Sequence, residues 1–88
     1  MNEEIKNHII SKCEKMGMKI IETNYWRTIL FLENDNAIVK ILVSPVSDEF
    51  YFEFWSYKLG EEQTCRFAIP ETLRGFIQVC NILKIFHN

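Results

Sequence analysis

Hydrophobic and polar residues alternate through the middle of the chain with the period of β-strands. The run from Glu49 to Tyr57 holds six of the twelve aromatic side chains, and these residue types favour a pleated, half-buried surface. Because successive side chains on a strand point to opposite faces, Phe50, Phe52 and Phe54 share one face. The other face carries Glu49, Tyr51, Glu53, Trp55 and Tyr57. We expect a core on the first face and a contact surface on the second.

The two ends of the chain show the period of amphipathic helices instead. We expect one helix over residues 3–16, capped by Asn2 and ended by Gly17. Its apolar stripe consists of Ile5, Ile9, Cys13 and Met16. A second helix is expected over residues 71–86, opened by Pro70. Its core stripe consists of Leu73, Phe76, Val79, Cys80, Leu83 and Phe86.

Four more segments have strand character, and they are residues 18–23, 26–33, 36–43 and 62–69. Tight turns are expected around Asn24, at Asn34-Asp35 and at residues 59–61. A two-residue turn at Asn34-Asp35 would pair Leu30 with Val39. The face then predicted for the core carries Trp26, Thr28, Leu30, Leu32, Ala37, Val39, Ile41 and Val43. Whether the first segment pairs at the sheet edge or continues into the second strand stays open.

The resulting order is helix, four or five antiparallel strands, helix, an α+β fold in a single domain over residues 1–88. Short links between successive strands favour a meander. Both helices should pack on the same sheet face, because each amphipathic helix needs an apolar surface to cover.

Composition narrows the class of protein. Hydrophobic residues make up 48% of the chain, which is ordinary for a globular domain, and the net charge of −2 is unlike the basic excess of a general nucleic-acid binder. The charged start and the lack of a membrane-length apolar stretch lead us to expect a cytoplasmic location without membrane contact. The widely spaced Cys13, Cys65 and Cys80 fit buried, reduced packing residues better than a disulfide framework or a metal site.

The groups able to do acid–base chemistry are poorly placed for it. His8 lies on the polar flank of the first helix, and His87 is the penultimate residue. Glu49 and Glu53 are four positions apart on one strand, about 13 Å. We expect Glu53 to be an interface charge that faces Arg66 or Lys40. No glycine-rich phosphate loop is present, so we expect neither catalytic residues nor a cofactor nor a metal.

If the helices cover one sheet face, the other is left with rings interleaved with charges. Tyr, Trp and Arg dominate protein interfaces, so this face predicts contact with another protein. The candidate partner-binding residues are Tyr51, Glu53, Trp55, Tyr57, Arg27, Lys40 and Arg66. The alternative is a face that covers itself with the stems of its own Arg and Lys side chains.

The second helix also carries apolar residues beyond its core stripe. The side of this helix expected to face solvent carries Ile77, Ile82 and Ile85. They indicate either a homodimer formed by this helix or a helix seated more deeply in the fold.

The end of the first helix, Lys15-Met-Gly17, and the opening Ile69-Pro-Glu-Thr-Leu-Arg74 of the second resemble small HicA-type toxins, which share the architecture of double-stranded-RNA-binding domains. The resemblance covers residues 5–83 and implies the helix–sheet–helix fold. Asn24-Tyr-Trp-Arg27 stands where those toxins carry a catalytic histidine, and the basic cluster of the RNA-binding domains is missing. It therefore implies fold rather than function.

We expect a small non-enzymatic protein-binding module, either a stoichiometric inhibitor of a host protein or an adaptor. In size, acidity and lack of catalytic residues the chain is similar in type to phage-encoded inhibitors such as anti-CRISPR proteins. The alternative function is single-stranded nucleic-acid or RNA binding, in which bases stack on the rings of the open sheet face.

Overall fold

The protein folds as two layers, a sheet and a pair of helices. The computed structural model describes residues 1–22, 25–58 and 61–86. Its elements are α1 (Glu3–Lys15), β1 (Lys19–Ile20), β2 (Thr28–Glu33), β3 (Ala37–Val43), β4 (Phe50–Lys58), β5 (Glu61–Ala68) and α2 (Leu73–Leu83). Three expectations, the turns around Asn24 and at residues 59–60 and the position of His87, lie outside the described residues.

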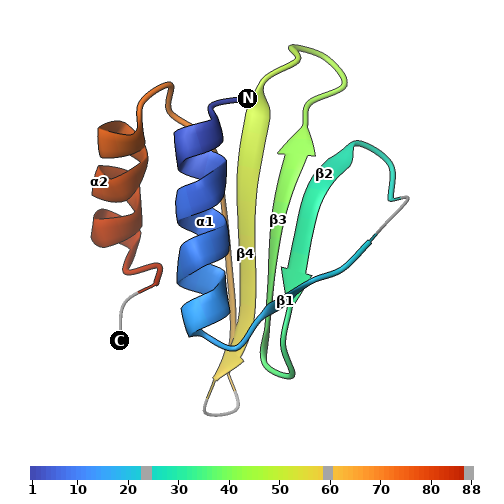
Figure 1. The fold of residues 1–88 in the computed structure, drawn as a ribbon, viewed down its shortest axis with the longest axis vertical. Helices are drawn as coiled ribbons and strands as arrows, with labels where there is room; N and C mark the ends of the chain where they lie inside the picture. The colour runs from blue at the N-terminus through green and yellow to red at the C-terminus, as the bar shows by residue number, and fades with distance from the viewer. Residues whose placement is uncertain (23–24, 59–60, 87–88) are drawn as a thin grey trace.

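The expected α+β meander is confirmed. All neighbouring strands are antiparallel, and the five strands follow one another across the sheet in the order of the chain. Both helices lie on the same side of the sheet (Figure 1). The question left open by the sequence is also answered, because β1 is a separate edge strand that pairs with β2.

The first helix forms as its sequence predicts and is joined to the sheet at its C-terminal end. The side chain of Asn2 accepts hydrogen bonds from the backbone N–H groups of Glu4 and Ile5, at 2.8 and 3.3 Å. Gly17 ends the helix with a φ of 75°, a conformation that glycine adopts without strain. The side-chain amide of Asn34 donates to the carbonyl of Met16 at 3.0 Å, which joins the helix end to the β2–β3 turn.

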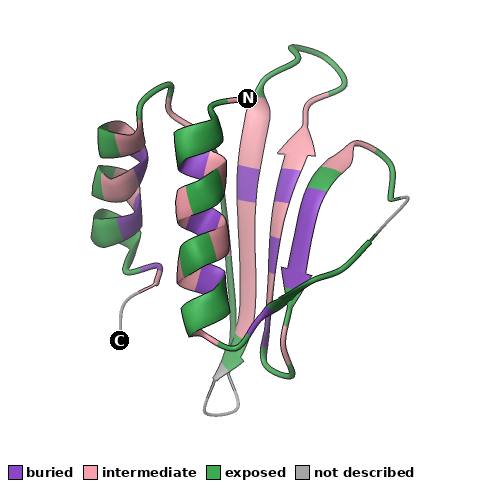
Figure 2. Cartoon of the chain, in the orientation of Figure 1, coloured by how far each residue is buried: buried purple, intermediate pink, exposed green. Residues whose placement is uncertain are grey.

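The core lies between the helices and the middle strands, and buried positions line the inner sides of both helices (Figure 2). Its largest fully buried side chains are Phe52, Phe76, Ile5, Ile9, Leu32, Ile41, Val39 and Cys13. The ring of Phe52 contacts Phe67, Phe76 and Phe86 with centroid distances of 5.2 to 5.9 Å. Stacked and edge-to-face rings let a short chain bury a large apolar area, so β4 supplies the centre of the core as its sequence indicates.

The predicted register of the β2–β3 hairpin is wrong by two residues. Leu30 pairs with Ile41 and not with Val39, because Asn34 lies opposite Ala37 and the two-residue turn is Asp35-Asn36 rather than Asn34-Asp35. The side-chain oxygen of Asn34 accepts hydrogen bonds from the backbone N–H groups of Asn36 and Ala37, each at 2.8 Å, and these bonds stabilise the turn at this position. Each residue from Leu30 onward still points to the sheet face predicted for it, because this shift in register does not change which side chains alternate to which face.

A β-bulge at the start of β2 corrects a second expectation. Thr28 pairs with Leu42, whereas Leu30 pairs with Ile41, so one extra residue is inserted in β2 between them. Thr28 therefore leaves the core face on which it was predicted. Trp26 was predicted for the same face and is instead 75% exposed.

The second helix is shorter than its periodicity predicts. It begins at Leu73, where the hydroxyl of Thr72 accepts the backbone N–H of Gly75 at 3.1 Å. A Cβ on Gly75 would lie 3.1 Å from both Pro70 and this hydroxyl, so the glycine makes room for the cap rather than for the sheet.

The helix ends at Leu83, and Lys84 follows in the left-handed conformation with a φ of 58°. This reversal corrects two expectations. Leu83, predicted for the core, is exposed. Ile85, predicted for the solvent-exposed side, returns to the core and is only 6% exposed.

Candidate functional site

The sheet face opposite the helices is the first candidate surface, and its charges are paired at the centre. Lys40 and Glu53 are cross-strand neighbours on β3 and β4 whose ammonium and carboxylate groups lie 3.8 Å apart. Arg66 on β5 is the register partner of Glu53 on the other side. The expectation that Glu53 faces Lys40 or Arg66 is therefore confirmed.

Two aromatic rings of this face are shielded by cations. The Lys40 ammonium lies 5.6 Å from the ring centre of Phe31, and the Arg66 guanidinium lies 5.1 Å from that of Tyr51. The ring of Tyr25 adds an edge contact to Phe31 at 5.7 Å. As a result Phe31 is only 7% exposed although no helix covers it. The centre of the face is thus self-covered to a large degree.

The rings toward the β2–β3 turn are more open. Trp55 is half-buried, and its indole N–H donates to the Glu62 carboxylate at 2.8 Å. Tyr57 is 53% exposed. The same Glu62 oxygen accepts the hydroxyl of Thr64 at 3.5 Å, so one carboxylate orders the surface between β4 and β5.

Arg27 does not join the other predicted partner-binding residues. It precedes β2 in a left-handed conformation, with its guanidinium 5.3 Å from the ring centre of Trp26. Its carbonyl accepts the N–H of Val43 at the end of β3, whereas Tyr57 donates its N–H beside the start of β3. The seven residues of β3 separate these two places by about 20 Å. The structure therefore gathers Tyr51, Glu53, Lys40, Trp55 and Arg66, with Arg27 and Tyr57 at opposite ends.

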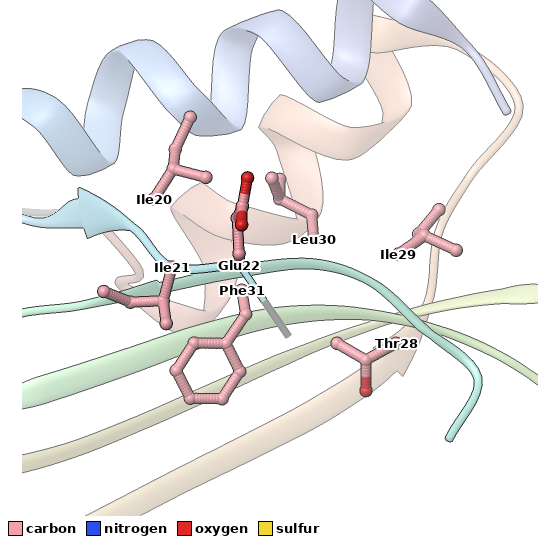
Figure 3. Close-up of a pocket in the computed structure, with 7 residues that line it drawn as sticks. All are labelled: Ile20, Ile21, Glu22, Thr28, Ile29, Leu30 and Phe31. Atoms are coloured by element: carbon pink, nitrogen blue, oxygen red, sulfur yellow. The ribbon is translucent and has the colours of Figure 1, made fainter. Parts of the chain in front are cut away.

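Sequence reasoning missed a set of exposed apolar residues along the β1 edge of the sheet. This set, called the apolar corner below, consists of Ile20, Ile21, Tyr25, Trp26 and Ile29. Because β1 is two residues long, its last contact with β2 is the Ile21 N–H to the Phe31 carbonyl at 2.9 Å. The chain then diverges from β2 and leaves a hollow of about 540 Å³ between residues 20–22 and 28–31. In Figure 3 the side chains of Leu30 and Phe31 leave β2 on opposite sides of this hollow.

The only hint of this corner in the sequence is the cluster of large apolar residues around a segment too short for a full strand. The corner adjoins the open face, because Tyr25 packs on Phe31, which in turn lies under Lys40. The two candidate surfaces are therefore continuous.

On α2, the residues predicted for self-association separate. Ile82 is 77% exposed and Ile77 is half-buried, whereas Ile85 belongs to the core. Ile82 and its neighbour Leu83 are thus the exposed apolar pair on this helix.

The three cysteine thiols and His8 have pKa values shifted by their surroundings. Burial raises the pKa of the Cys13 and Cys80 thiols to about 12, with smaller contributions from Glu14 and Cys65 respectively. Cys65, which was expected to be buried, is only partly so, and this partial burial also raises the pKa of its thiol. The pKa of His8 is lowered by burial and by the nearby Lys12 and Lys15, and its ring lies edge-on to Phe76 at 6.1 Å. A thiolate nucleophile is therefore disfavoured at neutral pH.

Within the described part of the chain, no three His, Cys, Asp or Glu residues gather as they would around a metal ion. In the same residues, no helix has the length and apolar character needed to cross a bilayer. Comparison with protein-family models, with curated proteins and with solved structures finds no match to this chain.

Proposed function

We propose that this chain is a non-enzymatic protein-binding module whose docking surface joins the apolar corner to the open sheet face. The observation that carries the proposal is Trp26, a large ring that is 75% exposed with the Arg27 guanidinium over it. Tyr25, its neighbour in the chain, is 64% exposed. Trp, Tyr and Arg are the residue types that most often dominate binding energy in protein interfaces.

The open face supplies the polar half of this surface. Its charges are already paired and its rings already held by neighbours, so little side-chain freedom is lost when a partner binds. Apolar anchors beside an ordered polar surface match the anatomy of protein interfaces. The proposed partner is therefore a folded protein, and the chain acts as a stoichiometric inhibitor or an adaptor in the cytoplasm.

Nucleic-acid binding, the alternative from the sequence, has less support. A phosphate backbone needs free cations, but Lys40 is paired with Glu53 and Arg66 lies over Tyr51. The carboxylate of Glu62 on the same face holds the Trp55 indole, which would repel phosphate from the ring on which a base could stack.

The test is photo-crosslinking in cells that express the full chain. A photoreactive phenylalanine replaces Trp26 in one variant and Ser11, exposed on the outer side of α1, in the control. The proposal expects a covalent protein adduct of one defined mass from position 26 and none from position 11. Equal labelling from both positions, or an adduct that nuclease removes, would contradict it.

Alanine variants then divide the surface into its parts. With the captured protein purified, Trp26→Ala and Trp55→Ala should each weaken binding by about 2 kcal/mol if they are anchors. Ile82→Ala is the matched control, because Ile82 is exposed on α2, in the helix layer rather than on the open face or the corner. Normal binding by both tryptophan variants, with circular dichroism unchanged, would show that the docking surface lies elsewhere.

A further inference from the structure

The two edges of the sheet differ in how they are protected against pairing with another chain. The β1 edge is two residues long and diverges at once. The β5 edge is eight residues long, and its register with β4 runs without a bulge from Tyr51–Ala68 to Lys58–Glu61. It also contains no proline. Long, regular edge strands without such features are templates for strand pairing.

Hydrogen-bond geometry shows which backbone groups of β5 face outward. The N–H of Ile69 donates to the carbonyl of Phe50 at 2.8 Å, so this pair is a hydrogen-bonded one. In an antiparallel ladder such pairs alternate along the strand. The backbone groups of Cys65 and Phe67 therefore point toward β4, and those of Glu62, Thr64 and Arg66 point away from the sheet.

We propose that two copies of this chain pair antiparallel through β5, with the two-fold axis at Thr64. In this register Thr64 lies opposite Thr64 of the second copy, and Glu62 lies opposite Arg66 of the second copy on both sides of the axis. The backbone N–H and C=O groups of these three residues point outward, so they can form hydrogen bonds with the second copy in the same register that pairs the charges.

Charge complementarity selects this register among its neighbours. An axis at Cys65 would place Arg66 opposite Thr64 and leave both charges without a cross-strand partner. An axis at Thr64 brings each carboxylate to a guanidinium, and opposite-charge and Thr–Thr pairs both stabilise antiparallel strands. All three residues are exposed in the single chain.

A hollow beside the edge also fits a second copy. It measures about 410 Å³ and lies between β5 and residues 83–85. A strand added about 4.8 Å beyond β5 would lie next to it and next to the exposed Leu83. The pairing would form one continuous sheet from both copies and leave the apolar corner at the far edge free.

The first test is a charge swap read by sedimentation equilibrium over a concentration series. The native chain should form a species of twice its 10.5 kDa mass. Glu62→Arg and Arg66→Glu should each weaken dimerisation by about tenfold or more, and the double swap should restore it. Glu62 and Arg66 are about 13 Å apart within one chain, so restoration cannot arise inside the monomer.

The second test reads the register by oxidation in a background where Cys65 is serine. Thr64→Cys should form a disulfide-linked dimer, because opposite Cα atoms of a hydrogen-bonded pair are about 5.5 Å apart, within disulfide range. Glu62→Cys is the matched control and should not, because its own symmetry mate is about 13 Å away.

A monomer at every concentration overturns the proposal, as does a dimer that survives both single swaps. A dimer lost in Ile82→Glu but intact in Glu62→Arg also overturns it, because self-association would then use α2. The corner that carries the proposed function lies on the opposite edge, so the crosslinking result and the dimer result can fail independently.

Discussion

The two faces of the sheet are built from alternate residues of the same strands, yet they shield their rings in different ways. On the helix side, Phe52 is fully buried among other rings. On the opposite side, Phe31 is only 7% exposed without a helix over it, and the Tyr25 ring and the Lys40 ammonium lie against its ring. A sheet face can therefore be protected without a second layer, and the exposed apolar residues collect at its margins, at Trp26 and Tyr57.

The largest expected effect breaks the covered face. Phe52→Ala should lower the free energy of unfolding by about 3–5 kcal/mol, because it removes a ring that contacts three others and leaves a cavity that rigid neighbours cannot fill. Urea denaturation measures the loss. Tyr51→Ala, next in the strand but on the open face, is the control and should cost less than half as much; equal losses would mean that both faces are core.

The next effect tests how much a self-covered ring contributes. Phe31→Ala should cost about 2 kcal/mol, because the ring is buried but Tyr25 and Lys40 can move into the space or admit water. The same denaturation assay measures it. A loss as large as that of Phe52→Ala would show that the open face is packed as tightly as the covered one.

A smaller effect separates the stem of Lys40 from its charge. Lys40→Met keeps an apolar stem over Phe31 but removes the partly exposed ion pair with Glu53, and should cost about 0.5 kcal/mol or less. Lys40→Ala removes the stem as well and should cost about 1 kcal/mol. If Met and Ala variants unfold at the same urea concentration, the stem contributes nothing and the pairing of charges shields the ring.

The smallest effect concerns pH and the helix side. Because the pKa of His8 is lowered in the fold, the unfolded chain binds the proton more readily, and stability should decline as the pH falls below the ordinary histidine value of about 6.5. The melting temperature of native protein should therefore drop more between pH 7.5 and pH 5 than that of His8→Gln. Equal drops in the two proteins would show that other groups carry the acid sensitivity.

Much of the fold was predictable because the signals for it are local. The cap at Asn2 and the end at Gly17 lie within a turn of the helix that they bound, and the alternation in Glu49–Tyr57 assigns faces to β4 without reference to any other strand. The same alternation predicted that Glu53 faces Lys40, because it places both side chains on one face of neighbouring strands β3 and β4.

The arrangement of the candidate docking surface was predicted less completely. The sequence placed Arg27 among the open-face charges, but Arg27 precedes β2 in a left-handed conformation with its guanidinium over the Trp26 ring. The apolar corner itself depends on how early β1 leaves β2, which is decided by contacts between segments distant from the local pattern.

By itself, then, the sequence determined the order of the elements, the two faces of the central strands and most of the separation of core from surface residues, since each of these depends on periodicities of two or 3.6 residues. Only the tertiary structure decided the bulge that exposes Trp26, the reversal at Lys84 that buries Ile85 and exposes Leu83, and the cations that cover Phe31 and Tyr51. The reason is physical. A periodic pattern indicates which side of an element is apolar, but one inserted residue or one residue in the left-handed conformation turns the following side chains to the other side. Whether such an irregularity forms depends on how the element packs against others, which the local pattern does not contain.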